Sequence, residues 1–138
     1  MNERFFTIYA MRCKENGKIY IGRTETTVRE RILLHLQALK RGKHNSPTLQ
    51  EDFNKYGKEA FEYYEIENNI CFENREKEGY YMDLYRTCNP QYGYNCKDHH
   101  NKVQDDFDII HGKPVIPNWK ESEKDGRMDF TTRIYAKA

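Results

Sequence analysis

Two tyrosines stand near the middle of two consecutive β-rich segments, Phe5–Arg12 and Lys18–Gly22. The segments are joined by a short turn that contains Asn16-Gly17, which is typical of an antiparallel β-hairpin. In such a hairpin, Tyr9 and Tyr20 are expected as cross-strand partners on one face, with their phenols close together. Paired phenols can position a water or exchange a proton, but tyrosines also pack well in strands without any chemical role.

An arginine, a histidine and a glutamate extend this set of candidate residues. Arg31 and His35 are four residues apart, so a helix places them on one face, as it also does for a solvated helix flank. Glu78 shares a helical face with Tyr81 and Tyr85. A carboxylate among apolar neighbours is costly unless it is paired or binds a cation, which favours a functional role for Glu78.

Capping signals and hydrophobic periodicity predict the elements that must position these residues. Thr27 and Glu30 have the spacing of a capping box, and the helix that follows is expected to end at Gly42. Ser46-Pro47 opens a second, short helix that closes at Gly57.

The remaining elements complete an α+β layout. Residues 60–68 are predicted as a third strand and residues 71–85 as a third helix, with Tyr81, Leu84 and Tyr85 facing inward. The order ββ-α-α-β-α predicts a small antiparallel three-stranded sheet flanked by helices. We place the main domain at residues 1–96 and regard residues 97–138 as a C-terminal extension, in which residues 127–137 alternate weakly and could add one strand.

Charge is distributed unevenly along a chain whose formal net charge is only +1. Residues 1–60 hold 12 Lys and Arg against 7 Asp and Glu, and residues 61–138 hold 11 against 15. This favours a polyanion as partner of the first half, although ordinary solvated charge gives the same pattern. The sequence has no apolar membrane span and no signal-peptide core, so we expect a cytoplasmic protein with reduced cysteines.

Several short motifs follow one another in a specific order over residues 5–96. They are Thr7-Ile8-Tyr9, Tyr20-Ile21-Gly22, Arg31 with His35, the stretch Gly42-Lys-His-Asn-Ser, Phe53-Asn-Lys-Tyr-Gly57, Glu78 before Tyr80-Tyr81, and Gly93-Tyr94-Asn95. In this order they resemble the GIY-YIG nuclease superfamily, and especially the catalytic domains of phage homing endonucleases. Thr7 departs from the pattern by replacing the first glycine, and Gly79 lowers helix propensity next to Glu78.

The resemblance implies a role for each candidate residue. Glu78 is expected to hold one divalent cation, Mg²⁺ with Mn²⁺ as a substitute, because Mg²⁺ keeps several waters and needs few protein ligands. Arg31 would stabilise charge on the phosphate, and Tyr9 would accept a proton from water with its pKa lowered by nearby cations. Tyr20 would position the water or phosphate, and His35 would support this network.

The resemblance also implies that the chain is a metal-dependent DNA endonuclease of homing-like or restriction type. Its products would carry 5′-phosphate and 3′-hydroxyl ends, and its partner would be double-stranded DNA, bound by a monomer or homodimer. The residues expected to bind DNA are Arg23, Arg29, Lys40, Arg41 and Lys43, while Gly22 and Asn95 are expected to shape the site.

Other interpretations stay open at this point. The chain could be a DNA-binding module of the same fold with weak or no catalysis. That interpretation does not explain why Tyr9, Tyr20, Arg31 and Glu78 are all present. A structural zinc at Cys88, Cys96, His99 and His100 is disfavoured because their spacing does not match a paired zinc motif. The recognition sequence, the choice between nicking and double-strand cleavage, and a homing, restriction or repair role do not follow from the sequence.

Overall fold

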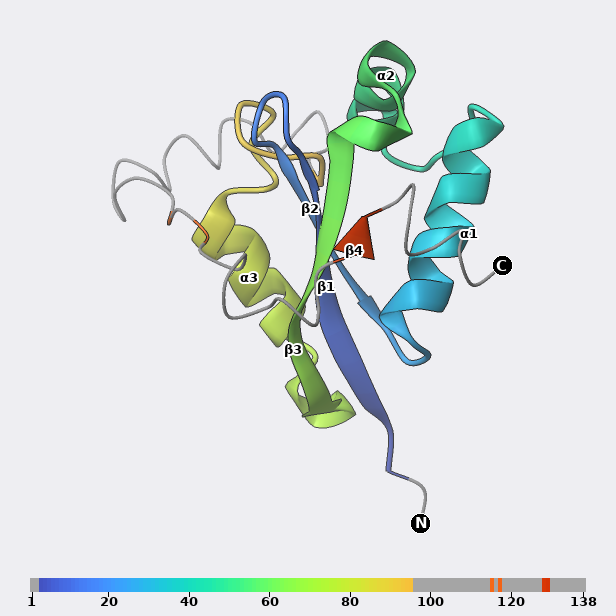
Figure 1. Ribbon diagram of the computed structural model, residues 1–138. Coiled ribbons are helices and arrows are strands. Elements are labelled where there is room, and N and C mark those ends of the chain that lie inside the picture. Colours follow the sequence, from blue (N-terminus) through green and yellow to red (C-terminus); the bar gives the residue numbers. More distant parts are fainter. Residues whose placement is uncertain (1–2, 96–114, 116, 118–127, 130–138) are drawn as a thin grey trace.

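The computed structural model describes residues 3–95, 115, 117 and 128–129. Its elements are β1 (Phe5–Cys13), β2 (Ile19–Thr24), α1 (Val28–Lys40), α2 (Pro47–Tyr56), β3 (Phe61–Cys71), α3 (Lys77–Tyr85) and β4 (Met128–Asp129), with single 3₁₀ turns at Lys58–Ala60 and Phe72–Asn74. The strands form one antiparallel sheet in the order β2-β1-β3-β4. The predicted α+β fold, with a three-stranded antiparallel sheet flanked by helices, is confirmed, and β4 adds a short strand beside β3 (Figure 1).

The central strand β1 divides its side chains between two hydrophobic cores. Tyr9 and Met11 point toward α1 and α2, whereas Ile8 and Ala10 point toward α3. Figure 1 shows the same division, with α1 and α2 on one side of the sheet and α3 on the other. The alternation follows from the two-residue period of a strand.

The capping residues act as the sequence predicts. The Thr27 hydroxyl accepts a hydrogen bond from the Glu30 amide at 3.1 Å and starts α1. Ser46 caps α2 in the same way, and Gly57 ends α2 with a positive φ of 85°. Each of these caps satisfies backbone groups that a helix end leaves without an internal partner.

The start of the third helix was predicted too early. A helix was expected from residue 71, but α3 begins at Lys77, and β3 continues to Cys71. The reason is strand pairing, because Phe5 and Phe6 of β1 pair with Cys71 and Ile70 and extend the ladder. Tyr85 is buried in the α3 core as expected, and Tyr81 and Leu84 pack against it in part.

Only a few residues of the C-terminal extension are described. The Val115 amide donates a hydrogen bond to the Leu84 carbonyl at 3.1 Å, and Met128–Asp129 pairs with β3. The rest of the expected strand at residues 127–137, as well as Cys96, His99 and His100, lies outside the described residues. The division into residues 1–96 and 97–138 stays a prediction. Among the described residues, no helix has the length and apolar character needed to cross a membrane.

Candidate active site

The phenols of Tyr9 and Tyr20 lie on the α1 face of the sheet. In the strand register Tyr9 pairs with Gly22 and Tyr20 pairs with Met11. The two tyrosines were expected to be direct cross-strand partners, but they are diagonal neighbours. A Cβ atom at Gly22 would overlap with the hydroxyl and ring of Tyr9. The absence of a side chain at Gly22 therefore allows the Tyr9 ring to lie across β2, the edge strand of the sheet.

A chain of hydrogen bonds leads from the start of α2 to the Tyr9 hydroxyl. The Ser46 amide donates to Nδ1 of His44 at 2.9 Å, and Nε2 of His44 lies 2.7 Å from Nδ1 of His35. Nε2 of His35 in turn lies 2.6 Å from Oη of Tyr9. The two imidazole rings stack at 4.9 Å, and Tyr20 meets the His35 ring edge-on at 5.3 Å.

The direction of this chain follows from its first donor. An amide N–H only donates, so Nδ1 of His44 is an acceptor and carries no proton. Burial lowers the pKa of His35 to about 3 and that of His44 to about 4, so both rings are neutral at pH 7. A neutral ring has one N–H, which makes His44 donate to His35 and His35 donate to Tyr9. Tyr9 is therefore the acceptor in this bond, and its own proton points elsewhere.

The electrostatic surroundings of the phenols differ from the expectation. Burial raises the pKa of Tyr9 well above its ordinary value near 10, and Tyr20 and Glu78 add to this rise. Arg31 opposes the rise through its charge and a hydrogen bond to Tyr9. The pKa of Tyr20 is also raised by burial and opposed by Arg31. Among the protein's own groups, burial thus outweighs the cationic influence that was expected to lower the pKa of Tyr9.

Glu78 approaches this group from α3. Its side chain is 24% exposed, and Nε of Arg23 lies 3.6 Å from its Oε1. No described residue donates a hydrogen bond of 3.5 Å or less to the carboxylate, and burial raises the pKa of Glu78 while Arg23 lowers it. Because Glu78 also raises the pKa of both phenols, its charge acts on the same site as Tyr9 and Tyr20.

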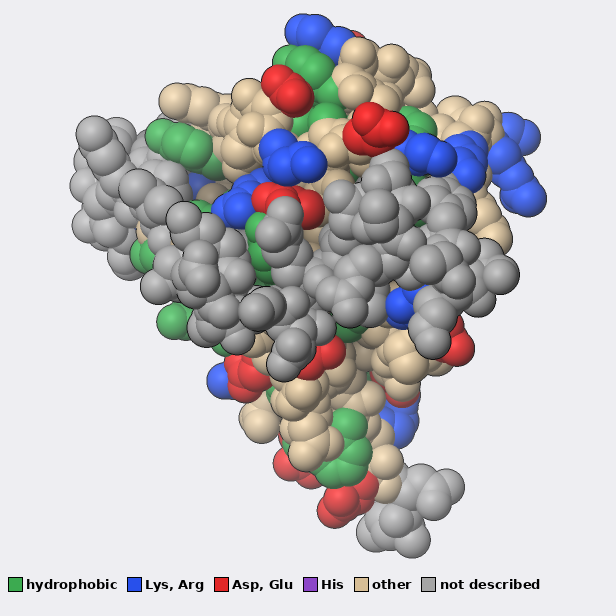
Figure 2. All heavy atoms as spheres, in the orientation of Figure 1, with side chains coloured by type: hydrophobic (Ala, Val, Ile, Leu, Met, Phe, Trp, Pro, Cys, Tyr) green, Lys and Arg blue, Asp and Glu red, His purple; other side chains and the backbone are tan. Residues whose placement is uncertain are grey.

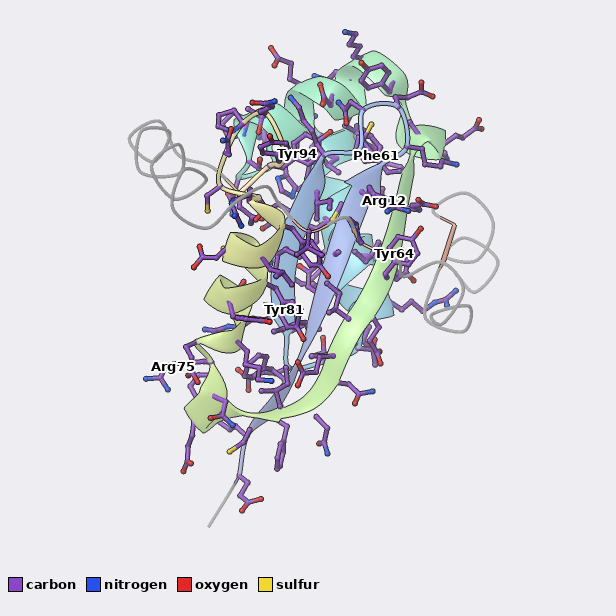
Figure 3. The ribbon with its side chains drawn as sticks, turned by 90° about the vertical axis from the view of Figure 1, so that its left-hand side faces the viewer. Arg12, Phe61, Tyr64, Arg75, Tyr81 and Tyr94 are labelled. Atoms are coloured by element: carbon purple, nitrogen blue, oxygen red, sulfur yellow. The ribbon has the colours of Figure 1, made fainter. Side chains whose placement is uncertain are left out.

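Asn95 holds the edge strand at the centre of the site. Its Oδ1 accepts from the Ile21 amide at 2.8 Å, and its Nδ2 donates to the Ile21 carbonyl at 3.0 Å. Ile21 lies between Tyr20 and Gly22, so the Asn95 side chain replaces a neighbouring strand at this position. The preceding Gly93 forms a parallel bridge with Ile19, where a Cβ atom would overlap with the Thr87 backbone. Figure 3 shows Tyr94, which follows Gly93, beside Phe61 at one end of the sheet.

Comparisons with known proteins agree with this arrangement. The model of the GIY-YIG catalytic domain matches residues 5–95, about two thirds of the chain. The chain belongs to the GIY-YIG family. Two solved structures are similar, the catalytic domain of homing endonuclease I-TevI and a glutamate-to-alanine mutant of the catalytic domain of intron endonuclease I-TevI. Both have 27% sequence identity and a TM-score of 0.60; the former covers 67% of this chain and 99% of its own, and the latter 68% and 95%. A search of curated proteins finds no match.

The donor set of this GIY-YIG domain fits a hard cation that keeps its own waters. Within the described residues, no three His, Cys, Asp or Glu side chains converge as a cluster for a metal ion. Among the residues that the structure describes, the site offers one half-buried carboxylate, Glu78, whose ion-pair partner is Arg23 at 3.6 Å. Such a carboxylate suits Mg²⁺, which uses one or two protein carboxylates, and not zinc, which takes three or four protein ligands.

The basic residues of the GIY-YIG domain do not form one group. Lys40, Arg41 and Lys43 are exposed at the end of α1 and in the turn after it, where Figure 2 shows Lys and Arg side chains at the upper right. Arg29 is half-buried in the first turn of α1, and Arg23 contacts Glu78 on the α3 face. Lys43 also lines an open pocket of about 110 Å³ beside the phenols, together with Tyr20, Arg31, Leu34, His35, Ala38, His44 and Asn45.

Two residues of the hydrogen-bond chain were not among the predicted site residues. His44 and Ser46 belong to the motif Gly42-Lys-His-Asn-Ser, which was quoted for the family resemblance without a role for either. Their contribution depends on the turn between α1 and α2, which brings His44 against His35. A larger cavity of about 540 Å³ lies elsewhere, lined by Arg12, Glu62, Tyr85 and Tyr92 among others, and includes none of the predicted site residues.

Proposed function

We propose that this chain is a metal-dependent DNA endonuclease that hydrolyses phosphodiester bonds and leaves 5′-phosphate and 3′-hydroxyl ends. The observation that carries the proposal is the convergence of Tyr9, Tyr20, Arg31 and Glu78, with a hydrogen-bond chain directed at the Tyr9 hydroxyl. The similarity to the catalytic domain of a homing endonuclease supports DNA as substrate. Double-stranded DNA, a homing-like or restriction role, and residues 1–96 as the catalytic domain are parts of the same proposal.

Tyr9 is the residue proposed to accept the proton of the attacking water. To do so it must be a phenolate, which its buried position disfavours in the metal-free protein. The N–H of His35 stabilises that phenolate, because it donates to Oη and cannot take the phenol proton itself. A phenolate at Tyr9 then receives a proton from water as the water oxygen attacks phosphorus, and the 3′-oxygen leaves with the bonding electrons.

Arg31 and Tyr20 act on the phosphate side of the same reaction. Arg31 supplies positive charge next to both phenols, where it stabilises the negative charge that develops on the phosphate oxygens. Tyr20 positions the water or the phosphate in the pocket that it lines with Arg31. When bound to Glu78, Mg²⁺, or Mn²⁺ in its place, would supply Lewis-acid stabilisation of the phosphate and further favour the Tyr9 phenolate.

The decisive test is a cleavage assay on supercoiled and linear plasmid DNA with Mg²⁺, Mn²⁺ or EDTA. We expect cleavage with either metal and none with EDTA. Glu78→Gln should reduce the cleavage rate at least ~10³-fold while DNA binding persists, because it removes the charge and keeps the shape. Glu76→Gln is the matched control, since Glu76 is exposed and two residues away.

Three outcomes would contradict the proposal. Undiminished cleavage in EDTA, or a Glu78→Gln variant as active as the wild type, would remove the metal assignment. DNA binding by the wild type without cleavage under any metal would instead favour a recognition module of the same fold.

DNA ligase should reseal cohesive products directly, because they carry 5′-phosphate and 3′-hydroxyl ends.

A further inference from the structure

A cation of the chain itself already contacts the carboxylate that is proposed to hold the metal. Nε of Arg23 lies 3.6 Å from Oε1 of Glu78, with the two side chains 36% and 24% exposed. Arg23 belongs to β2 and pairs with Ile8, so its side chain lies on the α3 face of the sheet, opposite to Gly22. This contact separates Arg23 from Lys40, Arg41 and Lys43, with which it was grouped for DNA binding.

Two aromatic rings hold the Arg23 guanidinium beside Glu78. Its Cζ lies 5.6 Å from the ring centre of Phe6 and 5.5 Å from that of Phe72. Phe6 comes from β1 and Phe72 from the 3₁₀ turn before α3, so the two rings belong to different parts of the fold. The two rings contact each other edge-to-face with their centroids 6.3 Å apart, and the planar guanidinium of Arg23 packs against both, which restricts its position. The contact with Glu78 is therefore built into the site.

The two cations compete for the same carboxylate. A divalent ion on Glu78 would stand a few ångströms from a guanidinium whose charge has the same sign, in a setting where both are partly shielded from water. Either Arg23 leaves when the metal binds, or the metal binds more weakly because Arg23 stays. In both cases the affinity of the site for metal includes the free energy of the contact between Arg23 and Glu78.

We propose that Arg23 occupies Glu78 as a stand-in cation in the metal-free protein and thereby sets the metal affinity of the site. The inference rests on the proposed function, in which Glu78 holds the metal. Arg23 keeps a half-buried carboxylate neutralised until a divalent ion arrives, and the ion has to displace the guanidinium. Removal of Arg23 should consequently tighten metal binding and destabilise the metal-free protein.

The test measures Mn²⁺ binding to the full chain without DNA, by electron paramagnetic resonance of the free ion and by calorimetry. The proteins are the wild type, Arg23→Met, Arg23→Lys, Glu78→Gln and Arg75→Met. Arg75 is the matched control because it also lies over Phe72, at 5.1 Å, and forms no ion pair with Glu78. We expect Arg23→Met to bind Mn²⁺ about 5- to 20-fold more tightly than the wild type, with Arg23→Lys and Arg75→Met close to the wild type.

Thermal unfolding gives a second readout. Arg23→Met should melt below the wild type without metal and at the same temperature in saturating Mn²⁺, because the metal then replaces the missing charge. Equal or weaker Mn²⁺ binding by Arg23→Met, with binding still abolished in Glu78→Gln, would overturn the stand-in role and leave the metal assignment intact. Absence of Glu78-dependent binding in both the wild type and Arg23→Met would overturn the metal assignment and the inference together.

Discussion

The role proposed for Tyr9 depends on which nitrogen of each neighbouring histidine carries a proton. The Ser46 amide fixes the tautomer of His44, His44 fixes that of His35, and His35 then presents an N–H to the Tyr9 oxygen. A protonated His44 would have an N–H at Nδ1 facing the Ser46 N–H, so the low pKa of about 4 keeps the chain intact at neutral pH. The neutral state of the two histidines is thus a condition for the proposed chemistry.

His44 should therefore affect the reaction without touching the substrate. We expect His44→Phe to lower the single-turnover cleavage rate by about 10- to 100-fold, because His35 then loses the donor that fixes its tautomer. His44→Gln should recover part of the rate, since its amide N–H₂ can donate to Nδ1 of His35. The pH–rate profile separates this role from a structural one, because the alkaline ionisation assigned to Tyr9 should move upward in His44→Phe. An unchanged profile with a uniformly lower rate would indicate that His44 only supports the fold.

The order of the motifs indicated the candidate site residues, whose roles stay predictions, but it did not indicate how these residues are arranged relative to one another. Tyr9, Tyr20, Arg31 and Glu78 stand in motifs whose order is specific, and in the structure the charges of Arg31 and Glu78 act on both phenols. Strand register decides that the phenols are diagonal, and a bulge in the pairing of β1 with β3 makes such details hard to read from spacing. The contact of Arg23 with Glu78 joins residues far apart in the chain, which no local pattern indicates.

Among the elements that the structure describes, strand β2 has one edge without a neighbouring strand, and a loop residue makes hydrogen bonds to its backbone there. Asn95 supplies both hydrogen bonds that a neighbouring strand would give to Ile21, between Tyr20 and Gly22. Local signals predicted the hairpin and the capped helices, because turn residues and caps act over a few positions. The contact of Asn95 with β2 spans most of the domain, so the sequence could suggest its importance only through the family motif.

Asn95→Asp should loosen this edge and lower activity. The carboxylate keeps the acceptor for the Ile21 amide but repels the Ile21 carbonyl, at a cost of about 1–3 kcal/mol in stability. We expect faster hydrogen exchange at the amides of residues 20–22 and a lower cleavage rate. Asn54→Asp is the control, since Asn54 is exposed on α2 and its carbonyl oxygen accepts from Gln50. Unchanged hydrogen exchange at Ile21 in Asn95→Asp would mean that β2 is stable without the two hydrogen bonds from Asn95.

For the molecule as a whole, the buried His35 and the half-buried His44 predict a loss of stability in acid. Their pKa values in the folded protein are about 3 and about 4, below the ordinary value of 6.5, so between these limits the unfolded chain binds more protons. The contribution of these two groups to the free energy of unfolding should be constant above pH 7 and decrease as pH falls from about 6.5 to about 3, with the share of His44 lost by about pH 4. After allowance for solvent, His44 accounts for on the order of 1–2 kcal/mol of this decrease. Denaturant unfolding at several pH values gives the free energy of unfolding as a function of pH. Between about pH 6.5 and about pH 4 this free energy should fall less steeply for His44→Gln than for the wild type. Equal pH dependence in the two proteins would contradict the conclusion that His44 is neutral in the folded state.

The positions of the basic residues predict that some of them affect DNA affinity and others affect the cleavage rate. Lys40 and Lys43 are exposed near the pocket, on the part of the surface where Figure 2 shows basic side chains over the end of α1. Contacts of this kind hold the phosphate backbone without reading bases. Lys40→Ala combined with Lys43→Ala should weaken binding to all sequences and reduce the salt dependence of log K by about 2 units, while cleavage at saturating protein recovers.

Arg31→Ala should behave in the opposite way. Arg31 is half-buried next to both phenols, and we propose that it stabilises charge that develops during the reaction. We expect its loss to raise the barrier by about 2–4 kcal/mol with a small change in DNA affinity. Single-turnover rates and binding constants at several salt concentrations distinguish the two variants, with Lys14→Ala combined with Lys55→Ala as a control of equal charge outside the pocket of the site. Normal cleavage by Arg31→Ala at saturation, with affinity alone reduced, would place Arg31 among the residues that hold DNA and leave the charge of the transition state to the metal on Glu78.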